Sequence, residues 1–219
     1  MVGLFDGLLA NGTLSEILPA EIFPAEILPA VILAEGSLIA IGKALLAIIL
    51  LLLAGDFIST FVYHVPEHAL GRLHCQVHHE KKQTFQHYAV LSTQPLVMLD
   101  GLLGALPYLL LAIILWPLSP IGTVMGLLFG ECHVVWRHTT KMGWKTPIGG
   151  KRLCDALWIV TPEAHWVHHE NGAIAFGDIF SFFDQPAQQW LKTLILLRKR
   201  LKKRLKKQRR QKTVKAQHL

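Results

Sequence analysis

The sequence is poor in charged residues and in cysteine. Only 17% of its 219 residues are Asp, Glu, Lys or Arg, while 52% are apolar, and ordinary soluble domains carry about 25% charged residues. The deficit points to a lipid environment. The three cysteines, an odd number without a C-x-x-C pair, argue against a disulfide framework and suit a reducing compartment beside the membrane. They are Cys75, Cys132 and Cys154.

Each end of the chain lacks charge of one sign. No Lys or Arg precedes Lys43, so the start is a poor match to a secretory signal, which begins with basic residues. No acid follows Asp184, and thirteen bases lie from Lys192 onward. Nine bases and fifteen acids precede Lys192, so the positive charge belongs to the tail. We expect the tail either to attract anionic lipids or to be a solvated segment that orients the protein. Nothing in the sequence resembles a nucleic-acid-binding module.

Long apolar runs are what the sequence has instead of charge. One run covers residues 37–63, and a second covers residues 96–136 without a single Lys or Arg. Trp116–Pro120 interrupts the second run. Crossing the hydrocarbon core takes about 20 apolar residues. We therefore expect one transmembrane helix over 37–63 and a helical hairpin through 96–115 and 119–136, rather than the buried core of a soluble protein.

These segments predict an all-α membrane-embedded helical bundle with about three transmembrane helices and a cytoplasmic, histidine-rich helical cap. Residues 1–36 form an acidic segment whose Pro recurs every five residues, and we expect it to be extended or loosely turned. Residues 37–190 form the membrane domain, and residues 191–219 form a basic tail with an interfacial helix. Cytoplasmic loops carry an excess of Lys and Arg. This rule puts the N-terminus outside, and the histidine clusters and the tail in the cytoplasm.

Histidine is the residue in excess. Eleven of the twelve histidines lie between His64 and His169. Residues three or four apart share a helix face, whereas adjacent residues diverge by about 100°. Adjacent histidines such as 78 and 79, or 168 and 169, can therefore serve two neighbouring metal ions. The predicted metal ligands are His64, His68, His74, His78, His79, His133, His138, His165, His168 and His169.

Other residues are expected to support these ligands. Thr161 and Pro162 are typical of a helix start, so the last histidine cluster should open a helix. Carboxylates could orient the imidazoles through their far nitrogens, and the candidates are Glu67, Glu131, Glu163 and Asp155. Whether Cys75 or His87 contacts metal stays open at this stage.

The number of histidines bears on the kind of site. A structural zinc site closes with four ligands, so eight or more histidines indicate two metal ions. Imidazole suits zinc, copper, iron and nickel alike. Two metals with nitrogen ligands at a membrane edge suit oxygen activation better than hydrolysis. A metal-dependent hydrolase, a metal transporter and a catalytically dead scaffold remain the alternatives.

The clusters resemble those of a known family. The segment Thr161-Pro-Glu-Ala-His-Trp-Val-His-His169 is similar to the T-P-x-x-H-x-x-H-H motif of the fatty acid hydroxylase and sterol desaturase superfamily. Residues 176–184 resemble the stretch that closes this family's domain, and His138 resembles its isolated histidine. The likeness covers roughly residues 50–185. It departs from the family pattern in the second cluster, where His74 stands one residue further from His78 and Cys75 occupies the expected place.

The resemblance implies a di-iron oxygenase. It would hydroxylate or desaturate a lipid (a sterol, a carotenoid or a fatty acyl chain) with O₂ as co-substrate. Two iron ions would be held by the histidines, with zinc possible in a purified state, and no catalytic residue is implied beyond the metal ligands. Electrons would come from an external donor such as a ferredoxin or a cytochrome b5-like protein. The substrate would enter from the bilayer.

Overall fold

The computed structural model describes residues 27–80 and 82–217, and the regular secondary structure of this part is helical, with one isolated bridge between Ile159 and Phe180. Its contacts divide the chain into two units, residues 1–43 and 44–219. The site lies in the second unit. The elements in chain order are α2 (Ile27–Ile58), η2 (Ser59–His64), α3 (Val65–Ala69), α4 (Leu73–Val77), α5 (Phe85–Tyr88), α6 (Pro95–Leu115), α7 (Pro120–Arg137), η3 (Thr139–Met142), α8 (Ile148–Ala156), α9 (Pro162–Glu170), η4 (Ser181–Phe183) and α10 (Asp184–Gln217).

The first apolar run forms α2, as expected, but the helix begins ten residues earlier. Residues 27–36 are helical rather than loosely turned. Pro29 lies in the first turn, where the missing N–H has no partner within a helix in any case. The rest of the predicted N-terminal segment lies outside the described residues.

The chain continues from α2 through a π-helical turn, η2, into α3. Pro66 follows this turn, in the first turn of α3. Proline removes a backbone donor and its ring crowds the preceding turn, so the helix cannot continue undisturbed through it. The wider π turn ends on His64. Such turns are frequent at functional sites, and here the turn places a histidine where the regular helix changes.

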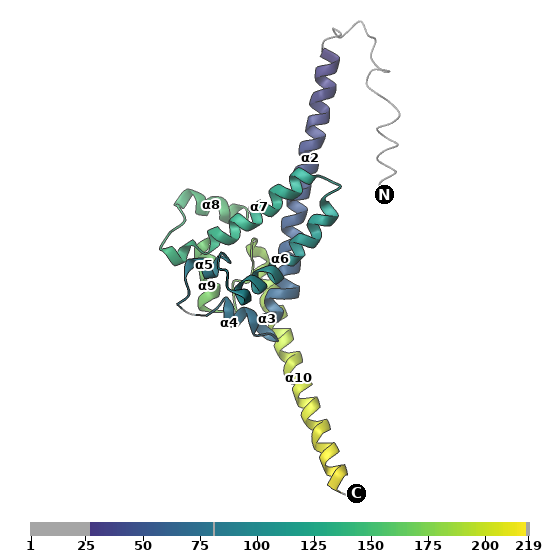
Figure 1. Cartoon of the computed structure of the whole chain (residues 1–219), viewed down its shortest axis with the longest axis vertical. Helices are drawn as coiled ribbons and strands as arrows, with labels where there is room; N and C mark the ends of the chain where they lie inside the picture. Colours follow the sequence, from purple (N-terminus) through teal and green to yellow (C-terminus); the bar gives the residue numbers. More distant parts are fainter. Residues whose placement is uncertain (1–26, 81, 218–219) are drawn as a thin grey trace. The chain divides into compact units, whose positions relative to one another are not determined.

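The second apolar run forms the expected helical hairpin of α6 and α7 (Figure 1). The Gly122 N–H donates to the Ser119 Oγ and so caps the second helix. A Cβ on Gly122 would collide with the backbone of Ala44, and one on Gly126 would lie 2.8 Å from Leu51 Cδ2. Small residues let two helices approach closely in membranes, so these glycines allow α7 to pack on α2.

Among the described residues, two helical segments are long and apolar enough to cross a membrane, Gly36–Ala69 and Pro95–Leu115. The third expected span is helix α7, which does not reach the same apolar character. Its C-terminal half carries the polar residues Glu131, His133 and Arg137, which lower its apolar character. This half lies next to the histidine-rich region. The fold is therefore all-helical with two candidate spans, and the division of the chain into 1–36, 37–190 and 191–219 stays a prediction.

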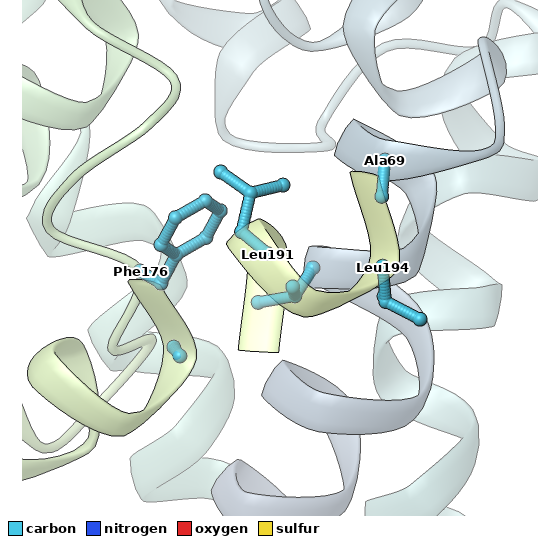
Figure 2. Packing of buried hydrophobic residues seen from close by; sticks show 6 residues of the cluster. Ala69, Phe176, Leu191 and Leu194 are labelled. Atoms are coloured by element: carbon cyan, nitrogen blue, oxygen red, sulfur yellow. The ribbon is translucent and has the colours of Figure 1, made fainter. Parts of the chain in front are cut away.

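The last helix, α10, packs against the end of the first span. Ala187, Leu191 and Leu194 are buried together with residues of α3 and with Phe176. Figure 2 shows Leu191 and Leu194 beside Phe176 and Ala69 of this cluster. The Arg198 guanidinium donates to the Ala69 carbonyl at 2.7 Å. Beyond Arg198, all described side chains up to residue 211 are exposed. The N-terminal part of α10 thus belongs to the body of the protein, and its basic part does not.

Candidate metal centre

The structure gathers nine of the ten predicted ligands into two groups. Within each group, one possible ligand atom per residue lies within 4.8 Å of all the others. Group 1 is His64, His68, His74, His79 and His168, and group 2 is His78, His138, His165 and His169. That these residues bind metal stays a prediction, and their convergence from five separate helical segments supports it.

Adjacent histidines divide between the groups as their helical divergence predicts. His78 belongs to group 2 and His79 to group 1, while His168 belongs to group 1 and His169 to group 2. The groups adjoin, with the His79 and His169 rings 5.1 Å apart between centroids. Helix α9 positions both residues 168 and 169. It starts as expected, with the Ala164 N–H donating to Thr161 Oγ1 and with Pro162 in its first turn.

Backbone carbonyls fix the orientation of two imidazoles. His138 Nδ1 lies 2.7 Å from the Val134 oxygen, and His168 Nδ1 lies 2.6 Å from the Ile174 oxygen. A carbonyl can only accept, so each Nδ1 must carry the proton. The lone pair on each Nε2 is then free to bind a metal. His168 Nε2 faces His64 Nε2 at 2.9 Å, and His138 Nε2 faces His165 Nε2 at 3.0 Å.

These nitrogen contacts fit metal ions better than hydrogen bonds alone. In group 2, His78 Nε2 lies 3.2 Å from His138 Nε2, and His169 Nε2 lies 3.2 Å from His165 Nε2. Imidazoles bind transition metals at about 2.0–2.1 Å, which spaces neighbouring ligands of one ion by about 2.9–3.4 Å. In group 1, within the described part of the chain, the buried Nε2 atoms of residues 68, 74 and 79 have no hydrogen-bond partner. A shared cation would satisfy all of these atoms.

Burial keeps four histidines of the two groups neutral and therefore able to bind a metal. It lowers the pKa of His79 and of His168 to about 3, with a neighbouring histidine as the next cause in each. Burial also lowers the pKa of His138 and His165 well below the usual value, and the nearby positive charge of Arg137 acts in the same direction. Metal binding requires the neutral imidazole, so the site is prepared for it at neutral pH.

An aspartate in helix α6 supports group 1. Asp100 is buried, and its Oδ1 lies 3.1 Å from His74 Nδ1. The same carboxylate accepts the Tyr63 hydroxyl at 2.5 Å. A carboxylate bonded to the far nitrogen orients a metal-binding imidazole and raises its basicity. The sequence signal for this role was an acid in an apolar run, because an ionisable residue inside a span is costly unless it is functional.

A second aspartate, Asp178, lies beside His64, with Oδ1 3.6 Å from His64 Nδ1. Arg137 holds this carboxylate by a 2.6 Å ion pair. The loop that carries Asp178 is fixed in turn by buried Asp56, which accepts the backbone N–H groups of Ile179 at 3.0 Å and Phe180 at 2.7 Å. The stretch after the last histidines thus serves to place a carboxylate at group 1.

The carboxylates proposed from the sequence for this supporting role have other partners. Glu163 accepts the backbone N–H and the hydroxyl of Thr146 at 2.6 and 2.8 Å, and Asp155 pairs with Lys151 at 3.0 Å. Glu67 accepts the backbone N–H of His74 rather than an imidazole N–H. The prediction was wrong for these three because spacing along the chain does not reveal which helix faces the site. Glu131 lines the apolar cavity beside the centre.

Three residues near the centre lie outside both groups. His133, a predicted ligand, directs its Nε2 at the Val160 carbonyl, 3.0 Å away. His87 directs its Nε2 at the Val77 carbonyl at 2.8 Å. Cys75 Sγ contacts His68 Nδ1 at 3.7 Å, while His74 reaches group 1 from the short helix α4. The shifted spacing in the second cluster is thus accommodated by His74 in group 1 rather than by Cys75.

An apolar cavity of about 420 Å³ reaches the centre. Its walls come mostly from α6 and α7, including Leu102, Leu109 and Leu127, and it ends on His64, His74 and His78. It therefore touches both histidine groups. The volume is in the range of ordinary ligand pockets, and the lining suits a hydrocarbon chain.

Comparison with known proteins adds a family. Residues 48–188 match the family model described as fatty acid hydroxylase, which is more than half of the chain. No curated protein and no solved structure gives a significant match. The matched range contains every histidine of both groups.

Proposed function

Because the chain belongs to the fatty acid hydroxylase family, a family of oxygen-dependent hydroxylases and desaturases, we propose that it is a membrane-bound di-iron enzyme that hydroxylates or desaturates a lipid. The observation that carries the proposal is the apolar cavity that ends on histidines of both groups.

The proposed reaction requires a redox metal. An unactivated C–H bond offers no acidic proton, so side chains alone cannot attack it. When bound, iron and O₂ supply the oxidising chemistry, and the protein supplies orientation and exclusion of water. Hydroxylation consumes O₂, two electrons and two protons, and releases one water.

The chain's own residues have distinct parts in this proposal. Groups 1 and 2 each hold one iron ion. Asp100 orients His74 through the Nδ1 proton, and Asp178 places a negative charge 3.6 Å from His64 Nδ1. The leucines of α6 and α7 hold the hydrocarbon and keep water from the histidines. Tyr63 lies on the wall of the same cavity, and its hydroxyl group donates a hydrogen bond to Asp100.

We place the N-terminus outside and the histidine groups on the cytoplasmic side, with α7 as a third span. The support is the distribution of Lys and Arg, which are absent from the turn between α6 and α7 and concentrated after His138. The proposed partners follow from this placement. They are a lipid from the bilayer, an external electron donor such as a ferredoxin or a cytochrome b5-like protein, and anionic lipids at the basic part of α10.

The test compares membrane lipids from cells with and without the gene, and adds a variant that closes the cavity. A Cβ on Gly104 meets only Tyr63, at 3.9 Å, so Gly104→Leu should narrow the cavity without moving a histidine. Gly149→Leu is the matched control, because nothing lies within 4 Å of its Cβ. We expect a new hydroxyl or double bond with the wild type and the control, and none with Gly104→Leu.

Iron content is measured on the same purified proteins. Wild type, Gly104→Leu and Gly149→Leu should each contain close to two iron ions per chain, one for each group. Lipids that are identical with and without the gene, from cells whose purified protein carries iron, would overturn the proposed function.

A further inference from the structure

A second cavity reaches the histidine centre through walls of a different character. It has a volume of about 310 Å³ and shares no lining residue with the apolar cavity. Its lining residues are His79, Lys82, Tyr88, Lys141, Trp166, His169 and Glu170. Because His79 belongs to group 1 and His169 to group 2, this polar cavity also touches both groups.

Two aromatic side chains of the polar cavity lie directly against a histidine of group 2. The Trp166 ring stacks on His169, with centroids 4.9 Å apart and an interplanar angle of 27°. Tyr88 contacts the same His169 ring at 5.0 Å and Trp166 at 5.5 Å. Trp166 is half-buried while Tyr88 is buried. The aromatic rings therefore extend from the cavity wall to a predicted metal ligand without a gap.

The charged residues at this cavity are mainly positive. Lys82 is exposed, and the half-buried Lys141 places its Nζ 5.5 Å from the centre of the Tyr88 ring. The single acid on the lining is the exposed Glu170. In the apolar cavity, in contrast, Arg137 is paired with Asp178. Within the described part of the chain, neither lysine forms an ion pair, and a positively charged rim accelerates association with a negatively charged partner.

We propose that the polar cavity is where an acidic one-electron carrier docks, and that its electrons pass through Trp166 and Tyr88 to His169 and the metal pair. The inference rests on the proposed function, which needs two external electrons in each turnover. In each transfer the carrier is oxidised by one electron and the metal pair is reduced by one, so that Trp166 and Tyr88 are unchanged overall. The substrate keeps the apolar cavity, and the two reactants approach from separate walls.

The first test measures reduction of the iron-loaded, oxidised protein by anaerobic stopped-flow absorbance. Trp166→Leu should slow reduction by dithionite several-fold at unchanged iron content, and Trp166→Phe should restore most of the rate because it keeps an aromatic ring on His169. Trp144→Leu is the matched control. Trp144 is 41% exposed, contacts Trp136 and is absent from the polar cavity.

The second test uses the sign of charge. The double variant Lys82→Glu/Lys141→Glu should slow reduction by the anionic dithionite radical and speed reduction by the methyl viologen radical cation, with opposite changes of about tenfold at low salt. Lys145→Glu/Arg152→Glu makes the same change of charge at two exposed residues that do not line the polar cavity. This control should leave both rates close to those of the wild type.

The outcomes separate this inference from the proposed function. If neither reductant changes the iron of the wild type, the redox function itself fails. If the wild type is reduced, but Trp166→Leu keeps the wild-type rate and the lysine variant shows no opposite response, the docking site is overturned while the oxygenase stands. If Trp166→Leu loses iron, the reduction rates of the lysine variant and of Trp166→Phe still test the docking site, because neither variant removes a predicted metal ligand.

Discussion

The two histidine groups differ in what supports their imidazoles. In group 1, carboxylates stand behind the ligands, with Asp100 bonded to His74 and Asp178 close to His64. In group 2, His138 is supported by a neutral backbone carbonyl. Among the described residues, no group 2 imidazole is hydrogen-bonded to a carboxylate. Carboxylates raise the basicity of a ligand imidazole, so we expect group 1 to hold its metal more tightly. Two sites built from one residue type are thus made unequal by their surroundings.

The largest effect should come from two single variants, each of which removes one ligand from a different group. His168 and His169 are neighbours in α9 but belong to different groups. His168→Ala should abolish the group 1 ion and His169→Ala the group 2 ion, and each variant should lose lipid oxidation entirely. Metal analysis of each purified variant should give about one ion per chain, since each variant removes a ligand from only one of the two groups. Equal retention of both ions in both variants would contradict the division into groups.

A smaller effect should come from the carboxylate behind group 1. Asp100→Asn keeps the shape but removes the charge that supports His74. We expect metal affinity at group 1 to fall about 10–100-fold, the usual cost of losing such a partner, with group 2 unaffected. Competition with a chelator during metal titration measures this affinity. Asp155→Asn is the control, because that residue is exposed and pairs with Lys151.

The division of the histidines into two groups could largely be predicted from the sequence. The residues that support their imidazoles could not. Helical spacing correctly divided 168 from 169 in α9, because the angle between neighbouring residues on a helix is fixed. Residues 78 and 79 also divide between the groups, although they lie just beyond the end of α4. The hairpin was predictable from the interruption at Trp116–Pro120, and the start of α9 was predictable from Thr161 and Pro162.

The supporting residues were not predictable in the same way. Asp100 lies 26 residues from His74, and Asp178 lies 114 residues from His64. Such pairings depend on how α6 and the loop after α9 pack against the rest. Local spacing carries no information about that packing. The same holds for the aromatic stack on His169, since Tyr88 comes from a short helix far away in the sequence.

Lowering the pH should reduce the folding stability of the metal-free protein, because histidines of both groups have lowered pKa values. Burial lowers the pKa of His79 to about 3 and lowers that of His165 well below its usual value. In the unfolded chain these residues titrate near pH 6.5. Between pH 6.5 and about 3 the unfolded state therefore binds more protons, and stability falls as the pH falls.

Thermal unfolding of the metal-free protein in detergent measures this effect. We expect the midpoint to fall between pH 7 and pH 4, by about 2–4 °C for each kcal/mol lost. His165→Gln removes one of the titrating groups and should reduce the slope. A midpoint that stays constant over this range would mean that the histidines are hydrated when the metal is absent, contrary to their burial.

The smallest effect should come from replacing His133, a predicted ligand that lies outside group 2. Its Nε2 must donate to the Val160 carbonyl, because a carbonyl only accepts. His133→Gln can keep this donation through its amide and should cost no more than about 1 kcal/mol, the usual value of one hydrogen bond. Both metal ions should remain. Loss of the group 2 ion in this variant, but not in His87→Gln, would show that His133 turns toward the metal when it binds, and would make group 2 a five-histidine site like group 1.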